Sequence, residues 1–207
     1  MIIKVCGMQN ADNIKDVDNI AEVNWMGFIF HPGSSRYVDH VPSYLPRYSK
    51  RVGVFVNDDK INIVRMVREF ELEYIQLHGD ESPEYINELR DIIPNDNIKF
   101  IKTVQISSNE DIASSYRYEG LVDYFLFETK TESYGGSGKQ FDWNIISEYK
   151  GSTPFLITGG IGPDDAKRIK SFRHPLFAGI DINSRFEISP ALKDVEMIRR
   201  FIKQVLI

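Results

Sequence analysis

The stretch "PFLITGGIGPDDAKRIKSF" (154–172) has the pattern of one complete strand-and-helix unit. It begins with a short apolar run and then breaks at a pair of glycines, Gly159 and Gly160. The segment that follows has acidic residues early and basic residues late, which suits the dipole of a helix. The stretch therefore predicts a buried strand, a tight turn and a capped helix, in that order.

The apolar run of this unit is one of eight along the chain. They are "IIKVC" (2–6), "WMGFIF" (25–30), "RVGVFV" (51–56), "YIQLH" (74–78), "IKFIKTV" (98–104), "VDYFLFE" (122–128), "PFLIT" (154–158) and "LFAGID" (176–181). Their spacing of roughly 20–30 residues is that of a repeated strand-plus-helix unit. Several runs are continuously apolar, as strands buried on both faces should be.

The repeat predicts an α/β protein, a (β/α)8 TIM barrel formed by one domain over residues 1–207. An open, doubly wound sheet is the second choice, because the chain has no dinucleotide-binding fingerprint. Helical patterns lie between the strands, over 10–23, 58–71, 82–93, 162–172 and 195–207. The segment "VPSYLPRY" (41–48) is too rich in proline for a regular helix, so the second unit is expected to be irregular.

The composition excludes several classes of function. A hydrophobic fraction of 42% and a charged fraction of 27% are typical of a soluble globular protein. The net charge of −5 gives no basic field for nucleic acid or for an anionic membrane, and we expect neither as a partner. We see no signal peptide and no apolar run of transmembrane length, so we expect a cytoplasmic protein.

The chain has one cysteine, Cys6, and four scattered histidines. A single cysteine cannot form an internal disulfide, which fits a reducing cytosol. None of the histidines has the paired spacing of a zinc site, so no metal is expected. A lone buried cysteine is usually a small apolar filler. Cys6, however, ends the first predicted strand, and the chemistry of a TIM barrel lies at the C-terminal ends of its strands.

Two loops of the predicted barrel have the composition of a phosphate site. In this fold the loops after the seventh and eighth strands usually form it, and here they contain Gly159-Gly160 and Asn183-Ser184-Arg185. Glycine lets the backbone approach an anion, and a helix N-terminus supplies N–H donors. A glycine pair alone would indicate only a tight turn. At these two loops of an eight-unit chain it favours phosphate binding.

The segment "GGSGK" (135–139) differs from a P-loop, because its spacing is wrong and Lys139 is followed by Gln140 instead of serine or threonine. We interpret it as a glycine-rich lid loop after the sixth strand.

A series of short motifs runs along the whole chain. They are "KVCGM" (4–8), "GFIFHPGSSRYV" (27–38), "VGVFVN" (52–57), "IQLHGDE" (75–81), "DYFLFET" (123–129), "GGSGKQFDW" (135–143), "LITGGIGPDDA" (156–166), "GIDINSRFE" (179–187) and "ALKD" (191–194). In this order they resemble the phosphoribosylanthranilate isomerase family, (β/α)8 enzymes of tryptophan biosynthesis. Each motif is weak alone, but the full series is specific.

The resemblance implies an Amadori rearrangement of N-(5-phosphoribosyl)anthranilate to 1-(2-carboxyphenylamino)-1-deoxyribulose 5-phosphate, without metal or organic cofactor. It implies Cys6 as the general base, and it places Glu128 where the family usually has an aspartate as general acid. Arg36 matches the arginine that binds the anthranilate carboxylate, a planar anion suited to guanidinium. Such a mechanism favours an acid with a raised pKa and a thiol with a lowered one. The partner is a small phosphosugar, and the protein is a monomer or a homodimer.

The chain departs from the family pattern at two positions. Glu128 adds a methylene to the acid, and Arg185 replaces the usual glycine with a side chain that could add a phosphate contact. These changes leave open a non-catalytic or weakly active phosphosugar-binding barrel. Indole-glycerol-phosphate synthase and a sugar isomerase of histidine biosynthesis are less favoured, because the first needs a lysine and the second two aspartates at the strand ends.

Four further polar residues receive provisional roles. Asp181 ends the eighth strand and either assists the chemistry or orients loops. His78 is interpreted as structural, satisfied by neighbouring backbone and near the substrate. The side chains of Asn183 and Lys193 are interpreted as structural as well.

Overall fold

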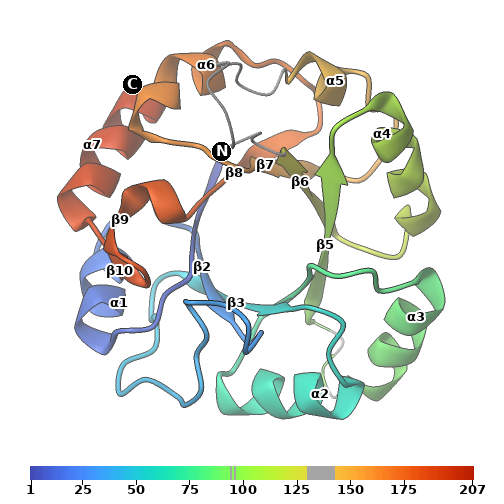
Figure 1. Ribbon diagram of the computed structural model, residues 1–207, viewed down its shortest axis with the longest axis horizontal. Coiled ribbons are helices and arrows are strands. Elements are labelled where there is room, and N and C mark those ends of the chain that lie inside the picture. Colours follow the sequence, from blue (N-terminus) through green and yellow to red (C-terminus); the bar gives the residue numbers. More distant parts are fainter. Residues whose placement is uncertain (94, 96, 130–142) are drawn as a thin grey trace.

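The computed structural model describes residues 1–93, 95, 97–129 and 143–207. Eight parallel strands close into a barrel in chain order (Figure 1). They are β1 (Ile2–Cys6), β2 (Trp25–Ile29), β3 (Lys50–Phe55), β4 (Tyr74–Leu77), β5 (Lys99–Ile106), β6 (Tyr124–Thr129), β7 (Phe155–Thr158) and β8 (Phe177–Ile182). The predicted TIM barrel is confirmed.

Helices surround the barrel (Figure 1). They are α1 (Ala11–Asp18), α2 (Lys60–Glu69), α3 (Pro83–Ile92), α4 (Asn109–Ser115), α5 (Asn144–Ser147), α6 (Ala166–Ser171) and α7 (Val195–Leu206). The five predicted helices are present, although the first ends at Asp18 and the fourth begins as a 3₁₀ turn, η2 (Pro163–Asp165). Helices α4 and α5 and the hairpin of β9 (Glu187–Ser189) and β10 (Leu192–Lys193) were not predicted from the sequence.

The second unit is irregular, as its prolines predicted. Residues 30–49, all of them described, contain no helix. One buried carboxylate fastens this segment instead: Asp18, at the end of α1, accepts hydrogen bonds from Tyr44 Oη at 2.8 Å, Arg47 N at 2.7 Å and Ser49 N at 2.9 Å. Burial alone would raise the pKa of Asp18, but these donors lower the pKa by more than burial raises it, and the net shift is downward.

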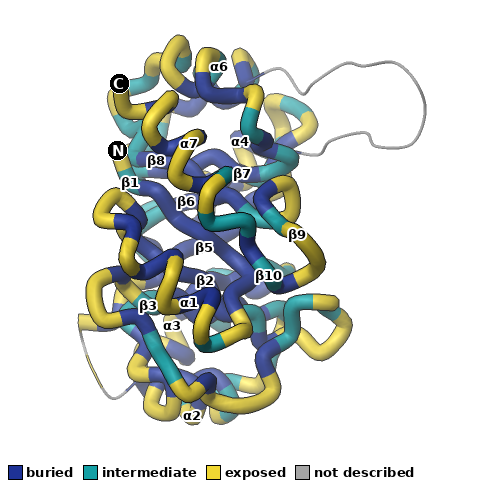
Figure 2. The backbone as a smooth tube through the Cα atoms, turned by 90° about the vertical axis from the view of Figure 1, so that its left-hand side faces the viewer, coloured by how far each residue is buried: buried dark blue, intermediate teal, exposed yellow. Residues whose placement is uncertain are grey.

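The core has two parts. The larger part lies between the strands and the helices, and Figure 2 shows buried strands enclosed by helices with exposed outer sides. The smaller part lies inside the barrel near the start of the strands and consists of Trp25, Val52, Ile101, Leu126 and Leu156. This inner cluster fills the N-terminal half of the barrel, so a cavity can form only towards the C-terminal ends of the strands.

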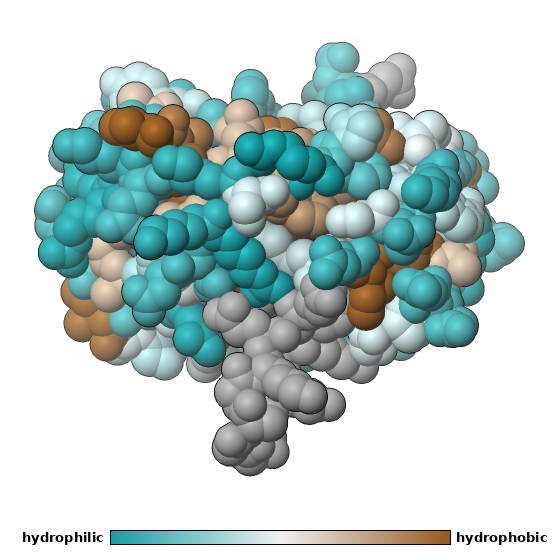
Figure 3. Space-filling model, turned by 90° about the horizontal axis from the view of Figure 1, so that it is seen from above, coloured by the Kyte–Doolittle hydropathy of each residue, from teal (hydrophilic) through white to brown (hydrophobic). Residues whose placement is uncertain are grey.

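The face seen in Figure 3 is mostly hydrophilic, with hydrophobic side chains in small separate patches. In the described part of the chain, no helix combines the length and the apolar character needed to cross a membrane.

Candidate active site

A cavity of about 350 Å³ lies at the C-terminal ends of the strands. Its lining comes from β1 to β4, from β6 to β8 and from the loops that follow them: Cys6, Ile29, His31, Ser34, Val54, Val56, Gln76, His78, Glu128, Thr158, Gly159, Gly160, Ile161, Asp181, Asn183 and Ser184. Most residues predicted for the site thus share one cavity. Arg36 and Arg185 lie outside this lining.

Cys6 is the last residue of β1 and is 5% exposed. The neighbouring strand leaves room for its sulfur only because it has a glycine there: a Cβ on Gly27 would lie 2.6 Å from Cys6 Sγ. Burial raises the pKa of the Cys6 thiol, and the cations of Lys4 and Lys193 oppose this rise without reversing it. The expectation of a lowered pKa is therefore wrong for the protein without substrate, because desolvation outweighs the nearby positive charge.

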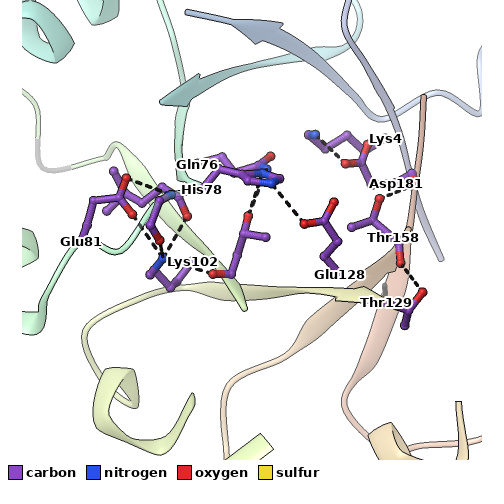
Figure 4. Close-up of polar contacts among 12 residues, drawn as sticks. Lys4, Gln76, His78, Glu81, Lys102, Glu128, Thr129, Thr158 and Asp181 are labelled. Atoms are coloured by element: carbon purple, nitrogen blue, oxygen red, sulfur yellow. Dashed lines mark hydrogen bonds and ion pairs between the residues drawn. The ribbon is translucent and has the colours of Figure 1, made fainter. Parts of the chain in front are cut away.

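Lys4 and Asp181 form a buried ion pair beneath the cavity, with Nζ 3.0 Å from Oδ2 (Figure 4). The side chains are 1% and 5% exposed. The other carboxylate oxygen, Asp181 Oδ1, is buried and has no hydrogen-bond partner among the described residues. Burial raises the pKa of Asp181, and Lys4 opposes the rise.

Glu128 lies on β6 and contacts His78 across the cavity, with Nε2 3.2 Å from Oε2 (Figure 4). On the other side of the ring, His78 Nδ1 lies 3.1 Å from Gln76 Nε2 and 3.3 Å from Thr103 Oγ1. A neutral ring that accepts at Nδ1 carries its proton on Nε2 and donates it towards Glu128. His78 is thus held by side chains and lines the cavity, so the expectation that backbone satisfies it is wrong.

The loop after β7 needs both of its glycines. Gly159 and Gly160 have φ of 96° and 67°, and a Cβ on Gly159 would lie 2.1 Å from the carbonyl oxygen of Thr129. Opposite this loop, Ser184 begins the 3₁₀ turn η3 (Ser184–Phe186). The two loops meet at the cavity wall, which brings together the backbone segments predicted to bind phosphate.

Arg185 lies across the loop after β7, because a Cβ on Gly162 would be 3.0 Å from Arg185 Cδ. Its side chain is exposed. Its φ is not among the positive values found in the described residues, so the backbone here does not require glycine. Replacing the family's usual glycine with Arg185 is therefore compatible with this turn.

Arg36 is fixed outside the cavity by Glu187. Its Nε and Nη2 donate to the two carboxylate oxygens at 2.8 and 2.6 Å, a bidentate pair. Glu187 also accepts from Lys193 Nζ at 2.6 Å, and Lys193 donates to Asn183 Oδ1 at 2.7 Å. Arg36 still passes close to the strand that carries the cysteine, since a Cβ on Gly7 would lie 2.6 Å from Arg36 Cδ.

The chain matches the family model of N-(5′-phosphoribosyl)anthranilate (PRA) isomerase over residues 3–204. A PRA isomerase of Parabacteroides distasonis is 48% identical over 100% of this chain and 94% of that protein. One of Phocaeicola vulgatus is also 48% identical, over 99% of this chain and 98% of that protein.

The chain belongs to the PRA isomerase family.

Solved structures of the PRA isomerase family share the fold. The crystal structure of phosphoribosyl anthranilate isomerase from Thermotoga maritima has a TM-score of 0.83 and 31% identity, and covers 99% of this chain and 98% of that one. Another, in complex with reduced 1-(o-carboxyphenylamino)-1-deoxyribulose 5-phosphate, has a TM-score of 0.78, 26% identity and the same coverage. The predicted family, and with it an isomerase of tryptophan biosynthesis, is confirmed.

The sequence analysis missed several residues of the site. Lys4 had a visible signal, because a lysine inside an apolar run and two residues before Cys6 must share the face of the cysteine. The same alternation places Gln76, on β4, beside His78, the residue that follows this strand. His31 and Ser34 come from the irregular segment after β2, where no periodicity indicates direction.

The expected lid, "GGSGK" (135–139), lies outside the described residues. Over the described ranges, no three His, Cys, Asp or Glu side chains are grouped to hold a metal ion.

Proposed function

We propose that this member of the PRA isomerase family converts N-(5-phosphoribosyl)anthranilate to 1-(2-carboxyphenylamino)-1-deoxyribulose 5-phosphate with Cys6 as general base and Glu128 as general acid. The observation that carries the proposal is that a thiol and a carboxyl line one cavity from β1 and β6, with the glycine loop after β7 in its wall. That arrangement offers a base, an acid and a phosphate-binding backbone to one phosphosugar.

The first step is ring opening. The carboxylic acid form of Glu128 donates a proton to the furanose ring oxygen, the bond from that oxygen to C1′ breaks, and the anthranilate nitrogen forms an iminium ion. The contact of Glu128 Oε2 with His78 Nε2 fixes the direction of the carboxyl group. It gives the longer side chain of glutamate a fixed position in the cavity.

The second step is proton abstraction. The Cys6 thiolate removes the proton from C2′, and the electron pair of that bond moves towards the iminium nitrogen to give an enolamine. The enolamine then gains a proton at C1′ and loses the proton of its 2′-hydroxyl, which yields the ketone. The positive iminium beside Cys6 favours the thiolate, so the pKa of the thiol, which burial raises, falls as the iminium forms.

The two ends of the substrate are anions, and we propose separate sites for them. The phosphate binds at Gly159, Gly160 and the turn Asn183-Ser184-Arg185. The anthranilate carboxylate binds at Arg36, whose Nη1 is the terminal nitrogen that does not donate to Glu187. Asp181 faces the sugar from the cavity floor.

We further propose that residues 1–207 act as a single domain in the cytoplasm, as a monomer or a homodimer, on this small phosphosugar. A related protein has been crystallised with the reduced product analogue, which supports a cavity adapted to a ligand of that class.

The experiment follows the loss of substrate fluorescence when purified protein is added to freshly made phosphoribosylanthranilate. We expect turnover by the wild type and almost none by Cys6→Ser or Glu128→Gln. Calorimetry with the reduced product analogue runs in parallel. Tight binding without turnover by the wild type would overturn the enzyme and favour a phosphosugar-binding barrel instead.

A further inference from the structure

The ammonium group of Lys4 is a buried charge to which the proposed reaction steps assign no role. Lys4 and Cys6 are two residues apart on β1 and therefore point to the same side, into the barrel. The ends of both side chains lie close to Gly27 on β2. A Cβ built on Gly27 would be 2.6 Å from Cys6 Sγ and 3.2 Å from Lys4 Nζ, so both atoms sit over the same glycine.

The same ammonium group also contacts Asp181 on the opposite side, with Nζ 3.0 Å from Oδ2. The ammonium group of Lys4 thus lies beside two acidic groups, the thiol of Cys6 and the carboxyl of Asp181. A buried carboxylate that only fastens strands normally has both oxygens bonded. Asp181 Oδ1 is buried without a partner among the described residues, and Asp181 borders the cavity.

We propose that Lys4 is a positioning residue for the reaction: its ammonium group stabilises the thiolate form of Cys6 relative to the thiol, and Asp181 limits that effect by sharing the same charge. This inference rests on the proposed function only for the role of Cys6 as base. Burial raises the pKa of the Cys6 thiol, and the charge of Lys4 is the strongest influence that opposes the rise.

The other two cations near Cys6 both pair with Glu187. Lys193 Nζ, from β10, donates to Glu187 and to Asn183. The guanidinium group of Arg36, from the segment after β2, pairs with the carboxylate of Glu187.

Across the cavity, His78, which follows β4, contacts Glu128 from β6. Among the described residues, Lys4 is the cation that most strongly opposes the rise in the thiol pKa, and ionisation of the thiol therefore depends on it most.

This role of Lys4 is compatible with the proton-abstraction step. The thiolate takes the proton from C2′ and becomes a neutral thiol, while the electron pair moves to the substrate iminium. Lys4 stays protonated throughout and remains paired with Asp181. The ammonium group thus lowers the cost of the thiolate before the step and needs no proton transfer of its own.

The test exploits the fact that Cys6 is the only cysteine in the chain. A pH titration of the rate of alkylation by iodoacetamide, followed by the mass of the peptide that contains Cys6, reports this residue alone and needs no substrate. We expect Lys4→Met to raise the thiol pKa by about one unit or more, which lowers the thiolate fraction at neutral pH about tenfold. Asp181→Asn should shift the pKa down, and Lys4→Arg should keep it close to that of the wild type.

Lys50→Met is the matched control, because Lys50 is half exposed and paired with Glu73 outside the barrel. It should leave the thiol titration unchanged. A folded Lys4→Met protein with the wild-type titration would overturn the proposal, whatever its activity. If Lys4→Met does not fold, Asp181→Asn decides, and the absence of a downward shift overturns the proposal.

The titration also separates this inference from the proposed function. If the thiol pKa shifts as expected but the protein does not turn over phosphoribosylanthranilate, the Lys4 inference stands and the proposed reaction is rejected. If turnover is normal but the thiol pKa does not shift, the reaction stands and the Lys4 inference is rejected.

Discussion

The Lys102–Glu81 pair and the Lys4–Asp181 pair are both buried, but they are bonded very differently (Figure 4). Lys102 Nζ lies 3.2 Å from Glu81 Oε2 and also donates to the carbonyls of Gly79 and Thr103, at 2.7 and 3.1 Å. The second oxygen of Glu81 accepts from the backbone N–H groups of Asn57 and Gly79.

The first pair therefore has both of its carboxylate oxygens bonded and joins the chain after β3 to β5 and the turn after β4. The second pair leaves Asp181 Oδ1 without a partner in the described chain and lies against the cavity and Cys6. A fully bonded buried network stabilises one structure, whereas an unpartnered buried oxygen is costly to the fold. The difference separates an ion pair that serves the fold from one that, as we propose, serves the chemistry.

The largest effect should come from removing the thiol of Cys6, which lies beside the Lys4–Asp181 pair. Cys6→Ser retains the size of the side chain but replaces a thiol with a hydroxyl that does not ionise at neutral pH. We expect kcat to fall by about 10²–10⁴-fold, the usual contribution of a general base. Single-turnover fluorescence measures this loss, and activity within a few-fold of wild type would remove Cys6 from the mechanism.

The next effect is on stability and distinguishes the two pairs directly. Lys102→Met leaves the carboxylate of Glu81 buried without its cation, and we expect a loss of about 3–5 kcal/mol in the free energy of unfolding. Lys4→Met should lose less, because Asp181 has a raised pKa and takes up a proton more readily. Urea unfolding of both variants at neutral pH provides the comparison, and equal losses would contradict the distinction.

A smaller effect concerns the acid. Glu128→Asp withdraws the carboxyl from His78 by about one carbon–carbon bond, and the present contact is 3.2 Å. We expect kcat/KM to fall by about 10–100-fold, since a displacement of this size is costly in a fixed site. A gain in activity would instead mean that the pocket still fits the aspartate usual in the family.

The smallest effect is in the pH dependence. Because burial raises the thiol pKa of the free enzyme, less thiolate is present at neutral pH, and kcat/KM should rise with pH towards that pKa. The steepest part of the rise should be about tenfold per pH unit. In Asp181→Asn the rise should move to lower pH, because a neighbouring negative charge is lost. A profile that falls from neutral to mildly alkaline pH would argue against a thiolate base.

The fold was predictable because strands buried on both faces leave continuous apolar runs, and eight of them recur with helical segments between. Cys6 and Glu128 were predictable for a related reason: each lies at or near the end of such a run, and parallel strands bring their ends to one edge. Family resemblance supplied their roles, which remain proposals.

What could not be predicted depends on contacts between distant residues. The anchor of Asp18 joins it to Tyr44, Arg47 and Ser49, and no local pattern indicates such partners. The raised pKa of Cys6 depends on how deeply the barrel buries it, which the sequence does not express. The short α4 and α5 helices have only 7 and 4 residues, too few to show a clear period.

The anchor at Asp18 also suggests how a TIM barrel can be made smaller. In the described chain each of the eight barrel strands except β2 has an α-helix between it and the next barrel strand or, for β8, before the end of the chain, and after β2 a single carboxylate with several donors fastens the connection to β3. A designer who wishes to shorten a barrel could exchange one outer helix for a proline-rich strap fixed at one point. That exchange would keep the strand buried and paired on both sides, as β2 is here, without the length of a helix.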